Sequence, residues 1–91
     1  MTPWAPCTIV WARAAAATLD LLAARAPQLA ERLHTAIGQY ALTGRGDVRA
    51  LSGQPGYRLR VGDWRVVFDL DIRRREVHVL RLAPRRDVYR P

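Results

Sequence analysis

The segment YRLRVGDWRVVF, residues 57–68, decides the fold of this chain. Apolar side chains alternate with basic or polar ones before Gly62-Asp63 and largely after it, and this period of two is typical of β-strands. A two-residue loop with glycine at its first central position fits a type II′ hairpin turn. The segment therefore predicts two antiparallel strands that are joined by a tight turn.

This turn fixes which residues of the two strands lie opposite each other. Arg60 faces Arg65, and Arg58 lies two residues away on the same strand as Arg60. Like charges directly opposite each other destabilise a sheet, so this side either has a function or is the solvated face of a basic protein. The other side is wholly apolar and suited to cover helices; it comprises Tyr57, Leu59, Val61, Trp64, Val66 and Phe68.

The sequence ahead of the hairpin predicts one strand and two helices. Residues 7–11 are mostly apolar and partly β-branched, which indicates a short strand. Residues 13–25 are rich in alanine and leucine, the best helix formers. Pro27 ends this helix and suits the first turn of the next one, whose apolar stripe runs to a terminator at Gly44. We therefore expect a helical hairpin.

The segments on either side of the strand pair complete the expected architecture. Residues 44–56 are rich in glycine and predict a loop. A charged turn at residues 71–75 precedes another strand over roughly residues 76–82. The order β-α-α-β-β-β predicts a single α+β domain over residues 1–91, in which a three-stranded antiparallel sheet follows the N-terminal strand and helices, with the helices packed on one face.

Charge is distributed unevenly along the chain. Its 91 residues include 15 basic residues, all of them arginine, against 8 acidic ones, for a net charge of +7. Residues 45–91 contain twelve arginines and six acidic residues, a net charge of +6. A basic half on a small domain indicates a polyanion or an acidic protein as partner.

Several classes of protein are disfavoured by the composition. Cys7 is the only cysteine, so an internal disulfide is excluded, and His34 and His78 lack metal-ligand spacing. We expect no metal and no cofactor. No apolar stretch approaches the roughly 20 residues of a membrane span, and the N-terminus lacks the pattern of a signal peptide. A cytoplasmic protein without a membrane contact is expected.

A second arginine cluster lies in LAPRRDVYRP, residues 82–91, where Arg85, Arg86 and Arg90 flank Tyr89. A tyrosine among arginines can stack on a nucleobase, and it can position or transfer a proton. The alternative is a basic tail with Tyr89 packed back on the domain. Taken alone, the segment favours the tail.

Together, the Leu51-Ser52-Gly53 stretch, YRLRVGDWRVVFDLD and EVHVLRLAPRRDVYR resemble the RelE/ParE superfamily of bacterial toxins over essentially the whole chain. The resemblance implies the toxin of a type II toxin–antitoxin system, held inactive by a cognate antitoxin in a hetero-oligomer. The RelE branch cleaves mRNA on the ribosome and inhibits translation, whereas the ParE branch inhibits DNA gyrase. We favour a RelE-like, metal-independent endoribonuclease. The alternatives are a gyrase inhibitor without nuclease activity and a fold relative that only binds nucleic acid.

The resemblance also implies a set of site residues. Arginines of the site would stabilise the charge that builds on the phosphoryl oxygens during cleavage. The chain departs from many relatives in carrying arginine where they have lysine on the hairpin, and Pro84 where they have histidine. Arginine stays protonated, so the general base is unassigned. The catalytic residues implied are Arg60, Arg65, Arg85 and Tyr89, and the implied RNA contacts are Arg58, Arg81, Arg86 and Arg90.

Overall fold

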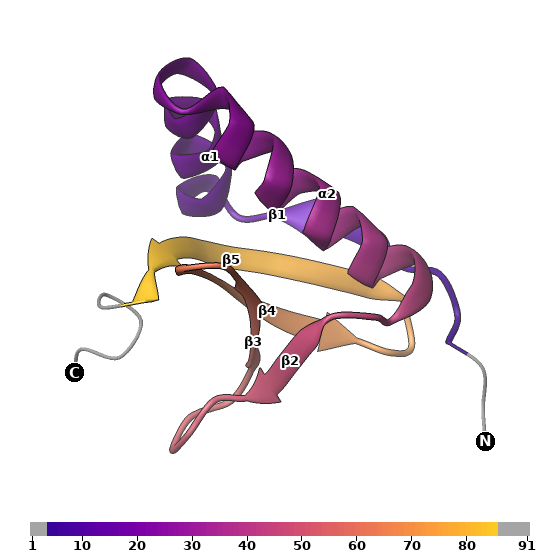
Figure 1. The fold of residues 1–91 in the computed structure, drawn as a ribbon. Coiled ribbons are helices and arrows are strands. Elements are labelled where there is room, and N and C mark those ends of the chain that lie inside the picture. Colours follow the sequence, from indigo (N-terminus) through magenta and orange to yellow (C-terminus); the bar gives the residue numbers. More distant parts are fainter. Residues whose placement is uncertain (1–3, 86–91) are drawn as a thin grey trace.

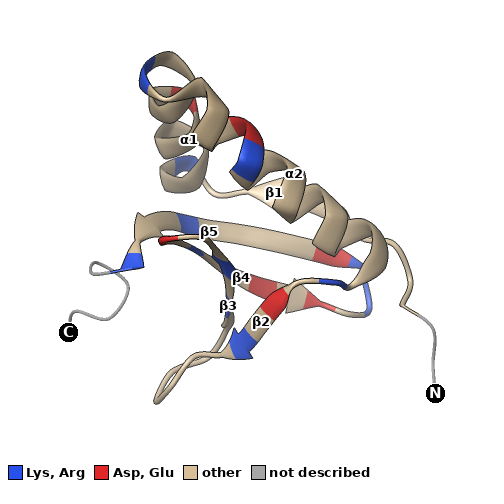
Figure 2. Cartoon of the chain, viewed as in Figure 1, with Lys and Arg blue, Asp and Glu red and all other residues tan. Residues whose placement is uncertain are grey.

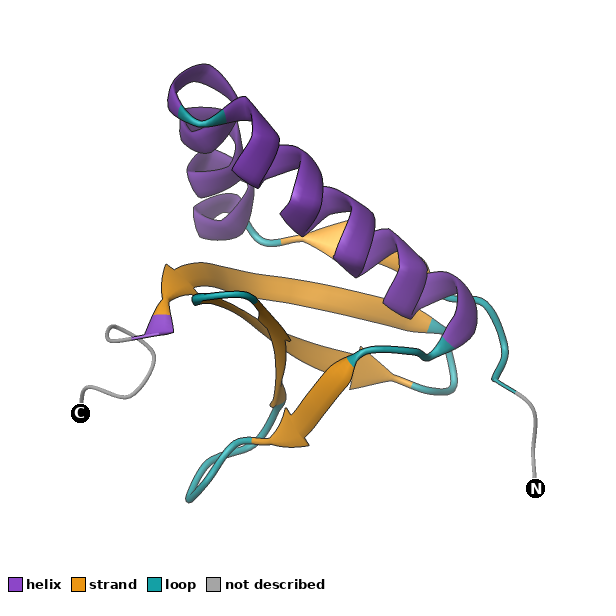
Figure 3. Ribbon diagram, viewed as in Figure 1, coloured by secondary structure: helices purple, strands orange, loops and turns teal. Residues whose placement is uncertain are grey.

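A computed structural model describes residues 4–85 and contains two helices packed on one face of a five-stranded sheet (Figure 1, Figure 3). The elements in chain order are β1 (Thr8–Trp11), α1 (Arg13–Arg25), α2 (Pro27–Thr43), β2 (Asp47–Ala50), β3 (Tyr57–Val61), β4 (Trp64–Asp71) and β5 (Glu76–Pro84). The predicted α+β class and the helical hairpin are confirmed. No helix in residues 4–85 is long and apolar enough to cross a membrane.

The sheet has the strand order β1-β5-β4-β3-β2, so the prediction of three strands was wrong. β2 lies within the segment expected to be a loop, where Val48 pairs with Leu59 of β3. β1 joins the opposite edge and runs parallel to β5, with Ile9 opposite Val77. A parallel pair needs a long crossover connection, and the intervening helices and strands supply it. The other three strand pairs are antiparallel.

The predicted hairpin register is confirmed. Arg60 pairs with Arg65 and Val61 with Trp64, on either side of the turn. Gly62 has φ 59, and Arg75 is the only non-glycine residue with positive φ in residues 4–85. One positive φ, at the first central position, fits the type II′ turn.

The two helices end where their sequences predict. Pro27 occupies the first turn of α2, and Gly44 closes that helix with a left-handed φ of 75, its N–H donating to the carbonyl of Tyr40 at 2.7 Å. Trp4 packs against this end and donates from Nε1 to the carbonyl of Ala41 at 3.0 Å. A Cβ at residue 44 would lie 2.6 Å from the Trp4 ring, so glycine also makes room for this contact.

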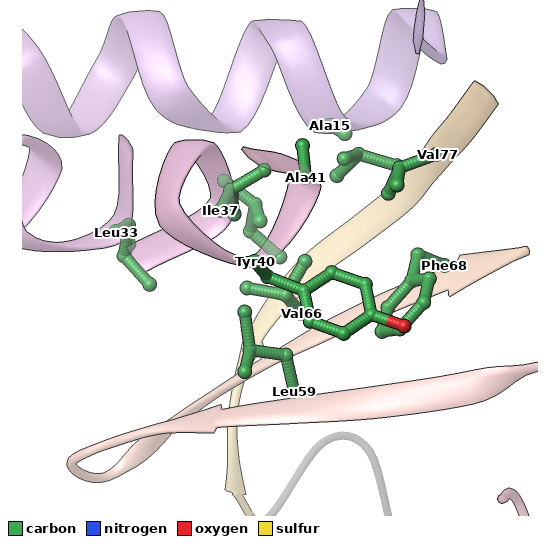
Figure 4. Packing of buried hydrophobic residues seen from close by; sticks show 11 residues of the cluster. Ala15, Leu33, Ile37, Tyr40, Ala41, Leu59, Val66, Phe68 and Val77 are labelled. Atoms are coloured by element: carbon green, nitrogen blue, oxygen red, sulfur yellow. The ribbon is translucent and has the colours of Figure 1, made fainter. Parts of the chain in front are cut away.

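The hydrophobic core lies between α2 and the apolar side of β3, β4 and β5 (Figure 4). Tyr40 of α2 packs against Phe68 of β4 with ring centroids 5.1 Å apart. Of the six residues predicted to cover the helices, three are buried: Leu59, Val66 and Phe68. The other three are only partly covered because they lie near the ends of the strands, and Tyr57 remains 38% exposed.

Candidate functional site

The side of the sheet that faces away from the helices is rich in arginine. Because side chains alternate along a strand, residues beside the buried Leu59 and Val66 point to this open side. Arg58 pairs with Arg49 on one neighbouring strand and with Val67 on the other, and Val67 pairs in turn with Arg81. We call this surface the arginine face; it comprises Arg49, Arg58, Arg60, Arg65 and Arg81.

Arg60 and Arg65 are direct cross-strand partners, yet they differ in burial. Arg60 is exposed, whereas Arg65 is only 2% exposed. Nη1 of Arg65 donates to the carbonyls of Gly62 at 3.2 Å and Trp64 at 3.0 Å. The guanidinium of Arg65 therefore holds the hairpin turn, and that of Arg60 is open to a ligand. The alternation of side chains along the strands predicted on which side of the sheet Arg60 and Arg65 lie. It did not predict how deeply each side chain is buried.

Two buried guanidinium nitrogens of the arginine face have no hydrogen-bond partner within residues 4–85. They are Nη1 of Arg58 and Nε of Arg65, which come from neighbouring strands. Buried polar groups are nearly always hydrogen-bonded, because an unpaired one keeps its desolvation cost. Guanidinium donors of this kind suit an oxyanion, such as a phosphate or a carboxylate, once one can reach them.

The arginine face carries a net positive charge, although Asp47 of β2 lies on the same side as the register partner of Arg60. The two ion pairs found in residues 4–85 join Arg74 to Asp71 and His78 to Glu76, both at the opposite end of β4 and β5. No ion pair within that range involves an arginine of β3 or β4. Figure 2 shows acidic residues on β4 and β5 towards the turn that joins these two strands. Basic residues lie near the C-terminal end of β5. The face therefore attracts anions.

Arg85 lies at the hairpin-turn end of the same sheet. Its backbone N–H donates to the carbonyl of Asp63 at 2.9 Å, which ties the end of β5 to the turn that Arg65 also holds. The structure thus brings Arg60, Arg65 and Arg85 to one end of the sheet, while Arg81 lies on β5 next to them. The remaining predicted site residues, Arg86, Tyr89 and Arg90, lie outside the described residues.

Arg49 belongs to the face although sequence reasoning did not single it out. It was missed because residues 44–56 were read as a loop, and a residue in a loop has no strand register. The weak signal available was the alternation of polar and apolar residues at Asp47, Val48 and Arg49.

In the part of the chain that the structure describes, the register positions around the five arginines hold no histidine, cysteine or tyrosine. The one carboxylate among them is Asp47, the register partner of Arg60. His78 lies five residues before Ala83, which is the register partner of Arg65 on β5. That separation is about 17 Å at about 3.3 Å per residue. Nε2 of His78 lies 3.0 Å from Oε1 of Glu76. Burial raises the pKa of Cys7, an effect that the charge of Arg75 opposes, but this thiol belongs to the other edge of the sheet.

One group of side chains could supply metal ligands. Asp71, Glu76 and His78 each offer one ligand atom, and these atoms lie within 4.8 Å of one another. Asp71 Oδ1 already accepts the backbone N–H of Arg74 at 3.0 Å, and Arg74 Nε lies 4.0 Å from Oδ2. The cluster lies at the far end of β4 and β5 from Arg65 and takes no part in the arginine face.

Residues 9–89 match the family model described as the ParE toxin of the type II toxin–antitoxin system parDE. The chain belongs to this family. It is the toxin of a type II toxin–antitoxin system, and the predicted RelE/ParE membership is confirmed. A search of curated proteins gives no match.

Solved toxins share the fold. The RelBE2 toxin–antitoxin complex from Mycobacterium tuberculosis matches with a TM-score of 0.72 and 23% identity, over 92% of this chain and 98% of the other. A YoeB/ParE toxin from Agrobacterium tumefaciens gives 0.71 and 16% identity, over 85% and 96%. The archaeal RelE–RelB complex from Pyrococcus horikoshii OT3 gives 0.60 and 22% identity, over 89% and 97%. At these identities the likeness establishes the fold alone.

Proposed function

We propose that this toxin is a RelE-like endoribonuclease that cleaves mRNA on the ribosome and so inhibits translation in the cytoplasm. The observation that carries the proposal is that Arg58, Arg60 and Arg65 share the open side of the sheet, while the backbone of Arg85 is bonded to the hairpin turn beside them. Their guanidiniums make no ion pair within residues 4–85. The planar fork of a guanidinium binds phosphate oxygens in pairs, so this arrangement suits an RNA backbone.

The reaction would proceed without a metal. The 2′-oxygen attacks the adjacent phosphorus, the bond to the 5′-oxygen breaks, and a 2′,3′-cyclic phosphate forms. Exposed Arg60 and the unpaired Nη1 of Arg58 would stabilise the charge on the phosphoryl oxygens, which is usually the largest catalytic contribution. Arg85 would stabilise the leaving 5′-oxygen, and Arg65 would keep the turn in the shape that places Arg60.

Residues of the C-terminal segment complete the proposed site. Tyr89 would stack on a base or move the proton between the 2′-hydroxyl and the leaving oxygen, since the arginines stay protonated. The RNA backbone on either side of the cut would lie against Arg81, Arg86 and Arg90. Each of these roles follows from the chemistry of the side chain and the family resemblance.

Inhibition of DNA gyrase is the second candidate. Two observations favour it: the matching family model describes ParE toxins, and the register positions around the arginines hold no histidine, cysteine or tyrosine within residues 4–85. A supercoiling assay with purified gyrase separates the two candidates. Accumulation of cleaved DNA complexes would replace the nuclease with the gyrase inhibitor.

The proposed partner is a cognate antitoxin that forms a hetero-oligomer with the toxin. The structures from M. tuberculosis and P. horikoshii are toxin–antitoxin complexes. The antitoxin of this chain would place acidic side chains across Arg58 and Arg60 or wrap the two helices. A complex that left both surfaces free would contradict this assignment.

The nuclease is tested by cleavage of a defined mRNA on programmed ribosomes. Arg60→Ala should lower the cleavage rate by about a hundredfold, as the loss of one oxyanion contact does. Arg45→Ala is the matched control, because it removes the same charge from the loop between α2 and β2. Equal cleavage by wild type and Arg60→Ala would reject the role of the arginine face.

A further inference from the structure

The turn between β4 and β5 carries a second cluster of arginines. We propose that Arg73, Arg74 and Arg75 form a separate RNA-contact site, which anchors the toxin to a structured RNA such as ribosomal RNA. The inference rests on the proposed ribosomal function. It adds an anchoring surface that contacts RNA away from the scissile phosphate.

These three arginines are exposed and stand on a fixed backbone. All three are exposed to solvent, and the side chain of Arg74 is 76% exposed. The N–H of Arg74 donates to Oδ1 of Asp71 at 3.0 Å, and the N–H of Arg75 donates to the carbonyl of Ile72 at 3.3 Å. The backbone held in this way carries three exposed guanidiniums side by side, of which that of Arg74 lies 4.0 Å from Oδ2 of Asp71.

The turn is also fastened to the edge of the sheet. The carbonyl of Arg75 accepts the N–H of Thr8 at 2.8 Å, which links it to β1. Arg75 has φ 53, an uncommon conformation for a residue with a side chain. Because these contacts hold both sides of the turn, a ligand would not have to order a loose loop when it binds.

The basic turn and the arginine face lie on the same side of the sheet but far apart. Arg73 lines a hollow together with Asp69 and His78, whose register places them on the open side. Glu76, the first residue of β5 after the turn, and Arg81 are five residues apart on that strand, a separation of about 17 Å at about 3.3 Å per residue. Figure 2 shows basic residues towards both ends of β5.

Acidic residues separate the two basic sites. Asp69, Asp71 and Glu76 occupy the open side between the turn and the arginine face. A single phosphate backbone that ran from one site to the other would pass over these carboxylates and be repelled. The arrangement therefore fits two separate backbone segments, as a folded RNA presents them, rather than one extended strand.

The composition of the turn favours RNA over a protein partner. A stable protein interface has an apolar, well-packed centre with a polar rim. The turn instead offers three consecutive guanidiniums, and the apolar side chains beside Arg73, namely Leu70, Ile72 and Leu80, share their hollow with charged ones. Side chains of this kind bind phosphates without reading sequence and make binding strongly dependent on salt.

The test compares two triple variants for binding to purified ribosomes over a range of salt concentrations, alongside mRNA cleavage. Arg73→Gln/Arg74→Gln/Arg75→Gln removes the proposed site. Arg13→Gln/Arg25→Gln/Arg45→Gln removes the same charge from exposed positions elsewhere. The turn variant should bind ribosomes about tenfold more weakly than wild type. The slope of the logarithm of its binding constant against the logarithm of the salt concentration should be smaller in magnitude by about two to three. Its cleavage rate at saturating ribosomes should match wild type, and the control should bind within about twofold of wild type.

Three outcomes would reject the anchor. Equal weakening in both triple variants would show that only net charge matters, and unchanged binding in the turn variant would show that the turn makes no contact. Weaker binding of purified antitoxin together with unchanged ribosome binding would assign the turn to a protein partner. Wild type that binds ribosomes through the turn but leaves mRNA intact would reject the nuclease and keep the anchor.

Discussion

The two sides of the sheet are stabilised in different ways. On the helix side, Phe68 is 1% exposed and packs between Tyr40 and Tyr57, so its burial is wholly apolar. On the open side, Arg65 is buried almost as deeply, but it bonds two backbone carbonyls and keeps one nitrogen unpaired within the described residues. The helix side stabilises the fold, whereas the open side holds a turn in place and presents the exposed Arg60 to an anion.

The largest expected effect is on the helix side. Phe68→Ala should lower the free energy of unfolding by about 3–5 kcal/mol, because it removes a buried ring and leaves a cavity. Val67→Ala is the matched control on the open side, where the side chain is half-buried, and should cost about 1 kcal/mol. Urea denaturation followed by circular dichroism measures both values. Equal losses at the two positions would show that the helix side does not dominate stability.

The next comparison separates the two arginines that pair across the hairpin. Arg65→Ala should lower the free energy of unfolding by about 2 kcal/mol, since it removes charged donors from two carbonyls near the turn. Arg60→Ala should change it by less than about 0.5 kcal/mol, because the side chain is exposed. The same denaturation experiment compares them. Similar losses would contradict the division into a positioning arginine and a ligand-binding arginine.

The sequence predicts the helix side of the molecule better than the open side. Alternation around Gly62 predicted the hairpin, its register and the burial of Leu59, Val66 and Phe68, because one buried face fixes the register of a strand. β2 was missed, since four residues between glycine-rich stretches carry little pattern of their own and are stabilised by pairing with β3.

The parallel pairing of β1 with β5 could not be predicted either. Residues 8–11 and 76–79 are far apart in the sequence, and no local pattern in either segment indicates that they pair. The site shows the same limit. The sequence placed Arg58, Arg60 and Arg65 on one side, but the burial of Arg65 depends on how far its guanidinium reaches towards the turn. Depth on a polar face is decided by such contacts, which periodicity does not encode.

The smallest expected effect concerns the hydroxyl of Tyr40, a residue of the apolar core. Burial raises the pKa of Tyr40 above its ordinary value of about 10, and the nearby charges of ionised Cys7 and Tyr57 raise it further. The folded chain therefore holds this proton more tightly than the unfolded chain does. The associated stability is fully present below about pH 10 and is lost as the pH rises through the folded pKa.

Tyr40→Phe isolates this effect, because it keeps the ring between Trp4 and Phe68 and removes only the hydroxyl. Cys7 and Tyr57 remain in both proteins, so the comparison differs only in the hydroxyl of Tyr40. Wild type should lose more stability than Tyr40→Phe between about pH 9 and 11, as measured by urea denaturation at each pH. Parallel curves would mean that the Tyr40 hydroxyl ionises as readily in the folded chain as in water. The helix side would then be wetter at this position than its burial indicates, and the contrast with the open side would be correspondingly weaker.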